Sequence, residues 1–172
     1  MTEELHRVAI IGSREFDDAR FVDKVVQRLV DRYGDKLVIV SGGARGTDLL
    51  AELAARRLCK HPPERIEALW AFQGDRAGPI RNEHIAKISD EMVAIYDPRS
   101  RTRGTAHAVK SMLKLGKQVY LYLVETKTWV TDPDELKKWS ESIIIPMPHE
   151  PSYEELQRRR YAPSWKLRRG AR

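Results

Sequence analysis

Glycine and arginine gather in four short segments of this 172-residue chain, and this pair of residue types is suited to holding phosphate. The segments read GSREF, SGGARGTD, QGDRAGPIRN and YDPRSRTRGT. Glycine lets backbone N–H groups approach oxygen atoms closely, and arginine offers paired donors that match phosphate oxygens. In or beside these segments lie seven of the ten glycines and seven arginines: Gly12, Gly42, Gly43, Gly46, Gly74, Gly78 and Gly104, with Arg14, Arg45, Arg76, Arg81, Arg99, Arg101 and Arg103.

An alternation of strand and helix patterns would bring the four segments together. Short apolar runs predict strands at residues 7–13, 36–43, 65–72, 91–97 and 117–124, and residues at helical spacing predict helices between them. Short strand–helix connections imply an α/β fold, a parallel sheet of about five strands with helices on both faces. Ligands bind such sheets beyond the carboxyl ends of the strands, where all four segments would lie. Helices starting near Thr47, Pro79 and Thr105 would point their N-termini at the same place.

Several kinds of protein are excluded or disfavoured. The segment GGARGTD lacks both the Gly-Lys-Ser/Thr of a Walker loop and the G-x-G-x-x-G of a dinucleotide fingerprint, which argues against P-loop ATP hydrolysis. The single cysteine, Cys59, rules out an internal disulfide and a Cys-rich zinc site, and no metal site is predicted. No apolar run approaches the roughly 18 residues that span a bilayer, and the N-terminus does not resemble a secretion signal. We therefore expect a cytoplasmic protein with no membrane contact.

The positive charge is concentrated at the C-terminal end. The net charge is +6, and residues 151–172 contribute +5 of it, from seven Lys or Arg residues against Glu154 and Glu155. We divide the chain into a domain at residues 1–124 and an extension at 125–172. The extension should contain a short helix at 131–139, a docking segment at 142–148 and a basic helix at 152–161. We expect Trp129 and Trp139 to pack on the domain or on a second subunit, whereas Trp165 could pack in the same way or stack on single-stranded nucleic acid.

Four blocks of the sequence resemble the YspA-type branch of the SLOG superfamily, whose relatives include the LOG and DprA proteins. In order they are VAIIGSREF, VSGGARGTDLLAELAA, WAFQGDRAGPIRNEHIA and RGTAHAVKSMLKLGKQV. The resemblance covers about residues 7 to 123. It implies a Rossmann-like fold that binds a nucleotide or nucleotide-derived ligand, in a protein of phage or bacterial origin. The implied ligand-binding residues are Gly12, Ser13, Arg14, Gly42, Gly43, Arg45, Gly46, Thr47, Asp48, Arg81, Asn82, Arg103, Gly104 and Thr105.

The resemblance leaves the question of a reaction open. LOG enzymes cleave the glycosidic bond of nucleoside monophosphates with a Glu shortly after Gly-Thr, and here the matching position is His107. A histidine stabilises a cationic sugar poorly, so this departure argues against the LOG reaction. Glu83 and Asp48 could substitute, which makes Glu83, His107 and Asp48 the candidate catalytic residues. A second departure is DPRSRTRGT, where relatives carry Pro-Gly-Gly; it would reshape the pocket towards a more highly charged ligand.

Three functions follow as hypotheses. The leading one is a sensor or processor that binds a phosphorylated nucleoside, with Ser13 donating to phosphate. Asp48 would either meet a sugar hydroxyl or only cap its helix, while Asn82 would tie its loop together. The alternatives are a DprA-type module that binds single-stranded DNA through the same edge and the basic tail, and a LOG-like N-ribosyl hydrolase. No cofactor is expected apart from Mg²⁺ accompanying a nucleotide, for which Glu15 and Asp97 are candidates, and the resemblance makes a homodimer plausible.

Overall fold

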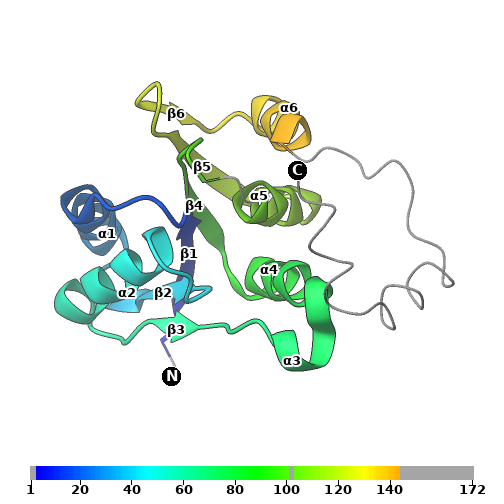
Figure 1. Ribbon diagram of the computed structural model, residues 1–172. Coiled ribbons are helices and arrows are strands. Elements are labelled where there is room, and N and C mark those ends of the chain that lie inside the picture. The colour runs from blue at the N-terminus through cyan, green and yellow to red at the C-terminus, as the bar shows by residue number, and fades with distance from the viewer. Residues whose placement is uncertain (1–2, 101–102, 144–172) are drawn as a thin grey trace, which may run out of the picture.

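A six-stranded sheet forms the centre of the molecule, with helices on both faces (Figure 1). The computed structural model describes residues 3–100 and 103–143. The strands are β1 (His6–Gly12), β2 (Leu37–Ser41), β3 (Glu64–Arg65), β4 (Glu91–Tyr96), β5 (Gln118–Leu123) and β6 (Thr128–Val130). Their order across the sheet is β3-β2-β1-β4-β5-β6; the first five are parallel, and β6 runs antiparallel to β5. The predicted Rossmann-like α/β fold is confirmed.

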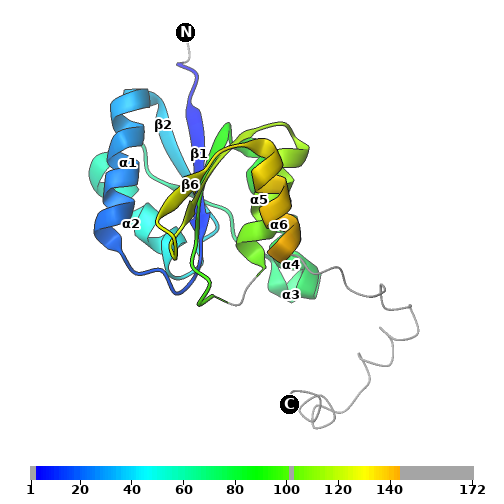
Figure 2. The ribbon, with the colours of Figure 1, turned by 90° about the horizontal axis from the view of Figure 1, so that it is seen from above.

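The helices divide into two layers. They are α1 (Ala19–Tyr33), α2 (Thr47–Leu58), α3 (Trp70–Gln73), α4 (Ala77–Ile88), α5 (Gly104–Lys114) and α6 (Pro133–Ile143), with single 3₁₀ turns at Gly34–Lys36 and Gly74–Arg76. Figures 1 and 2 show α1 and α2 on one face of the sheet and α4, α5 and α6 on the other. None of the helices in the described part of the chain has the length and apolar character needed to cross a bilayer.

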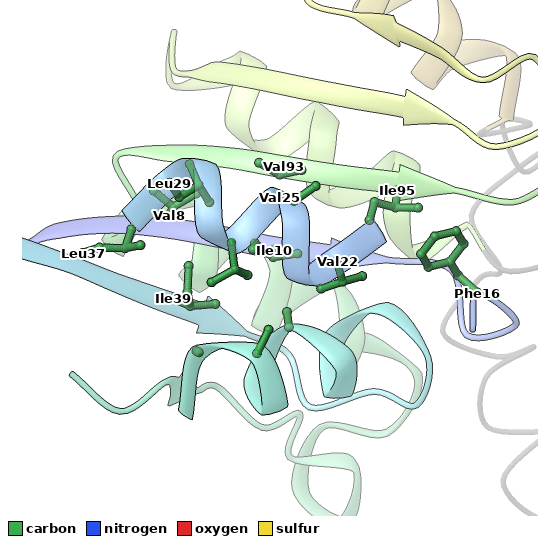
Figure 3. Close-up of a cluster of buried hydrophobic side chains, with 14 residues drawn as sticks. Val8, Ile10, Phe16, Val22, Val25, Leu29, Leu37, Ile39, Val93 and Ile95 are labelled. Atoms are coloured by element: carbon green, nitrogen blue, oxygen red, sulfur yellow. The ribbon is translucent and has the colours of Figure 1, made fainter. Parts of the chain in front are cut away.

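Each layer buries its own apolar cluster against the sheet. Figure 3 shows the first, in which Val22, Val25 and Leu29 of α1 lie against Ile10 and Val93 of the strands. These α1 residues recur at helical spacing, and the Phe21 N–H donates to Asp18 Oδ1 (3.0 Å), which caps the helix. The second cluster joins α4, α5 and α6 to the opposite face. Both faces of the sheet are thus covered by helices, and its carboxyl edge is left for the loops.

The predicted third strand is present, but it ends at residue 65 and does not extend to residue 72. Only Glu64 and Arg65 pair with β2; the chain then leaves the sheet and forms the short helix α3. The side chains of Leu69, Trp70 and Phe72 are exposed. In a strand the charged residues 65 and 67 would lie on one face and the apolar residues 66, 68, 70 and 72 on the other, so the pattern itself predicts a strand and does not mark where the chain leaves the sheet.

Part of the segment that we assigned to the C-terminal extension joins the sheet and its helical layer. Strand β6 pairs with β5, and α6 places Leu136 in the second apolar cluster. Trp139 packs edge-on against Tyr96, with ring centroids 5.1 Å apart, and Trp129 lies 6.0 Å from the ring of Phe21. The predicted basic helix and tail, and most of the docking segment, lie outside the described residues.

Candidate functional site

Two adjoining hollows lie at the carboxyl ends of β1 and β2. We call the narrower one, about 60 Å³ in volume, the inner hollow, and the wider one, about 260 Å³, the outer hollow. The inner hollow is lined by Ile11, Gly12, Arg14, Gly42, Ala44, Asp48, Arg81, Asn82, Gly104 and Thr105. The outer hollow shares Arg14, Gly42, Ala44 and Arg81 with it and adds Gly43, Arg65, Glu67, Ala68 and Trp70. The loops after β1 and β2 and the starts of α4 and α5 therefore meet at one place, although they are far apart in sequence.

Asp48 ties the first two loops together from within. It is 3% exposed, and its carboxylate accepts hydrogen bonds from the Gly12 N–H (3.2 Å) and the Gly42 N–H (3.0 Å). Burial raises the pKa of Asp48 to about 6, even though Arg81 and these N–H donors favour the charged form. Because both carboxylate oxygens already bond to backbone, the side chain acts as an internal clasp between the loops. It does not cap α2, whose N-cap is Gly46.

Arg81 and Asn82 extend the same network to the other two segments. Arg81 Nη1 donates to the Gly42 carbonyl (2.7 Å), and Arg81 Nε donates to Asn82 Oδ1 (3.0 Å). Asn82 Nδ2 in turn donates to the Gly104 carbonyl at the start of α5 (3.2 Å). These bonds leave the second terminal nitrogen of Arg81, Nη2, without a hydrogen bond to any described residue. The partly buried guanidinium can therefore still donate into the hollows.

Arg14 supplies a second cation to both hollows. Its side chain is exposed and makes no hydrogen bond or ion pair within the described residues. Burial lowers the pKa of Arg81, and the nearby charge of Arg14 lowers it further, while Asp48 opposes both effects. Two positive charges thus act on one another here, and an anion placed between them would relieve the repulsion.

Two predicted phosphate contacts point elsewhere. Ser13 is buried; its hydroxyl accepts from the Asp97 N–H (2.8 Å) and donates to the Asp97 carbonyl (3.3 Å). Thr47 is also buried and donates to the Ser13 carbonyl (3.1 Å). The two hydroxyls therefore join one loop to another. The prediction that Ser13 donates to phosphate does not fit this geometry, because its hydrogen bonds are already made within the protein.

Gly46 shows how closely these loops approach each other. Its φ is +77°, and a Cβ atom there would lie 2.4 Å from the Arg14 carbonyl oxygen and 2.6 Å from that of Ser13. The residue must therefore be glycine for two reasons, its backbone conformation and the lack of space. This glycine, predicted as a ligand contact, serves the packing of loop on loop.

Other predicted arginines and carboxylates neutralise one another. Arg45 Nη2 lies 2.8 Å from Glu15 Oε1 at the surface. Arg99 donates to both carboxylate oxygens of Asp97, and these hydrogen bonds hold the pKa of Asp97 below its usual value. The two carboxylates considered for Mg²⁺ are therefore each paired with an arginine. In residues 3–100 and 103–143, no group of three His, Cys, Asp or Glu side chains could hold a metal ion.

The remaining predicted residues lie at the edge of the site or beyond it. Arg103 is exposed at the N-cap of α5, and the backbone of Gly104 and Thr105 begins that helix at the inner hollow. Glu83 is exposed on α4, and His107 is half-buried on α5. Burial lowers the pKa of His107, while the charge of Glu83 raises it. Neither residue lines a hollow, so of the three catalytic candidates only Asp48 does.

Sequence reasoning missed a second buried network beneath the double glycine. Glu52, buried on α2, receives two hydrogen bonds from Arg65, at 2.9 and 2.6 Å, and one from the Ser41 hydroxyl at 2.8 Å. Burial alone would raise the pKa of Glu52, but these hydrogen bonds hold it below its ordinary value. The sequence pattern that could have revealed this network is a glutamate four residues after Asp48, on the same helix face and among buried alanines. Sequence reasoning also missed Trp70 in the wall of the outer hollow.

Known structures share this fold. DNA processing protein A (DprA) of Streptococcus pneumoniae matches 68% of this chain at a TM-score of 0.55 and 23% identity, and this chain spans half of that protein's length. The structure of DprA from Helicobacter pylori describes a single-stranded DNA binding mode. The match covers 80% of this chain and 74% of the H. pylori chain, with a TM-score of 0.53 and 18% identity. The match to the molybdenum cofactor binding protein of Rippkaea orientalis covers 84% of this chain and all of that protein's chain, with a TM-score of 0.50 and 18% identity.

The sequence itself identifies the family. The Gene 61 protein of Mycobacterium phage D29 is 31% identical over 116 residues, which cover 65% of this chain and 92% of the phage protein. Residues 6–71, from β1 to the start of α3, match the YspA, cpYpsA-related SLOG family. These matches confirm the resemblance drawn from the four sequence blocks, and the chain belongs to the YspA-related SLOG family.

Proposed function

We propose that this protein binds a phosphorylated nucleoside at the carboxyl edge of its sheet, with a phosphate group in the inner hollow. The observation that carries the proposal is the pair Arg14 and Arg81, which line a hollow of about 60 Å³. That volume is far below the roughly 300–1,000 Å³ of sites for drug-sized ligands, so the hollow suits a small oxyanion better than a nucleobase. Arginine is the side chain best matched to phosphate, and the crevice beyond the strand ends is where such sheets bind ligands.

The start of α5 adds to the same attraction. Gly104 and Thr105 line the inner hollow, and the first N–H groups of a helix have no partner inside that helix. They carry the positive end of the helix dipole, which favours a bound anion. Two guanidinium groups and a helix N-terminus therefore act on one small volume.

The test measures binding of nucleoside mono-, di- and cyclic phosphates and ADP-ribose to the wild type and to two variants. Arg14→Ala should weaken binding by roughly 10- to 100-fold, because a hydrogen bond to a charged group contributes about 1.5–3 kcal/mol. Arg45→Ala is the matched control: it removes an arginine from the next loop, but that side chain is paired with Glu15. Thermal shift and calorimetry provide the readout. Equal binding by the wild type and Arg14→Ala would contradict the proposed phosphate site.

Binding of single-stranded DNA is a second candidate, favoured by the fold that this chain shares with the DprA proteins. In that case the inner hollow would hold one phosphate of a strand, and the outer hollow would leave room for the strand to continue. Oligonucleotide binding would weaken steeply with salt, because a strand contacts several phosphates. A free nucleotide would show a shallower salt dependence. A LOG-like hydrolase would instead release free base from a nucleoside monophosphate, which chromatography detects.

A further inference from the structure

The wall of the outer hollow differs chemically from that of the inner hollow. Its added residues include Glu67, whose side chain is 73% exposed, and Arg65, which is held in place by its two hydrogen bonds to the buried Glu52. Arg65 faces two carboxylates, those of Glu52 and Glu67, so this wall adds no unbalanced positive charge that could hold a second phosphate group. The volume of about 260 Å³ is close to the lower end of small-molecule sites. The outer hollow therefore suits the uncharged part of a ligand whose phosphate lies in the inner hollow.

Trp70 provides an aromatic surface at this wall. The residue is 54% exposed, and the edge of its indole lies over Gly78 in the first turn of α4, where a Cβ atom would be 3.2 Å from Cη2. No other aromatic ring of the described residues stacks on the indole, so much of this large apolar group faces solvent at the edge of a cavity lined by arginines. Exposed aromatic side chains beside arginines are suited to stacking on nucleobases.

We propose that Trp70 is a base-stacking residue, which holds the nucleobase in the outer hollow while Arg14 and Arg81 hold the phosphate in the inner one. This inference rests on the proposed function and adds to it the position of the base. The shared residues Arg14, Gly42, Ala44 and Arg81 make the two hollows one continuous space. One nucleoside phosphate unit, free or part of a single strand, can therefore occupy both.

The experiment compares adenosine monophosphate with ribose 5-phosphate, which carries the same phosphate and sugar without a base. Trp70→Ala should weaken binding of the nucleotide by roughly 5- to 150-fold, the range for losing one base–aromatic stack, and should leave ribose 5-phosphate unchanged. Trp70→Phe should retain most of the nucleotide affinity, because its ring can still stack. Phe72→Ala is the matched control, since Phe72 is 86% exposed two residues away and lines neither hollow.

The outcomes separate the inference from the proposed function. If Arg14→Ala weakens nucleotide binding and Trp70→Ala does not, the stacking role is overturned and the phosphate site stands. If Trp70→Ala weakens ribose 5-phosphate equally, its effect is on the fold and the stacking role is again overturned. If the wild type binds neither a nucleotide nor a single-stranded oligonucleotide, both proposals fail. A Trp70 effect on the oligonucleotide alone supports stacking and identifies a strand as the source of the base.

Discussion

The loops at the carboxyl edge of the sheet and the segment that follows β3 use their residues in opposite ways. In the loops after β1 and β2, the buried polar side chains of Ser13, Thr47 and Asp48 bond to the backbone of a neighbouring loop. In the segment from residue 66 to residue 76, Leu69, Trp70 and Phe72 face solvent. The first region is built by contacts within the protein, and the second offers surface that the protein itself does not use.

Arginines show the same contrast at the level of single side chains. Arg45, Arg65 and Arg99 each face a carboxylate, so their charge is balanced inside the protein. Arg14 makes no such pair within the described residues, and Arg81 bonds only to a carbonyl and an amide oxygen. A cluster of arginines in a sequence therefore overstates the positive charge offered to a ligand. What remains for an anion is the charge left after internal pairing.

The largest expected effect on stability comes from replacing Gly46, which lies where the loops pack on one another. Gly46→Ala should lower the free energy of unfolding by about 4 kcal/mol, because it combines left-handed backbone strain with overlap against the carbonyls of Ser13 and Arg14. Gly74, next to α3, has a φ of +56° but no atom within 4 Å of a built Cβ. Gly74→Ala should therefore cost only the backbone strain, about 1–3 kcal/mol. Urea denaturation of both variants measures the difference, and equal losses would contradict the close loop packing.

A second effect concerns Asp48 and depends on pH. Its pKa is raised from 3.8 to about 6 in the folded protein, so between these pH values the folded state binds more protons than the unfolded state. The stability that Asp48 contributes is therefore greatest below pH 3.8 and falls as pH rises through 6, by up to about 3 kcal/mol. Asp48→Asn removes this contribution. The wild type should thus lose stability relative to the variant across this window.

Denaturation of the wild type and Asp48→Asn at a series of pH values isolates that contribution. Other carboxylates, such as Glu52 with its lowered pKa, act in the opposite direction but are present in both proteins. The difference between the two curves therefore reports Asp48. Parallel curves would show that its carboxylate is not buried in the loop clasp.

The smallest expected effect lies in the segment after β3. Phe72→Ser should change the free energy of unfolding by less than about 0.5 kcal/mol, because an 86% exposed side chain loses almost no contacts. Thermal denaturation measures it. A loss of several degrees would mean that this segment packs more tightly than its exposure indicates, and the contrast with the loops would disappear.

The arrangement of the site could be predicted from the sequence, but the partners of its side chains could not. Alternating strands and helices place every strand-to-helix loop at one edge, so the meeting of Gly12, Gly42 and Gly104 followed from topology. Whether the side chains of Ser13 and Thr47 face a ligand or a neighbouring loop depends on backbone and side-chain torsion angles, which residue type alone does not determine. The exposure of Trp70 could not be predicted for a related reason. An apolar run has the same sequence pattern whether it lies inside a sheet or leaves the sheet after two residues.

The clasp between Asp48, Gly12 and Gly42 has a consequence for the speed and thermodynamics of ligand entry. Hydrogen bonds made during folding already fix the backbone of Gly12 and Gly42, so a ligand meets these two loops in an ordered state. Association with a preorganised cavity loses little conformational entropy and does not wait for a lid to close. Entry would then be controlled by diffusion and by the electrostatic pull of two guanidinium groups.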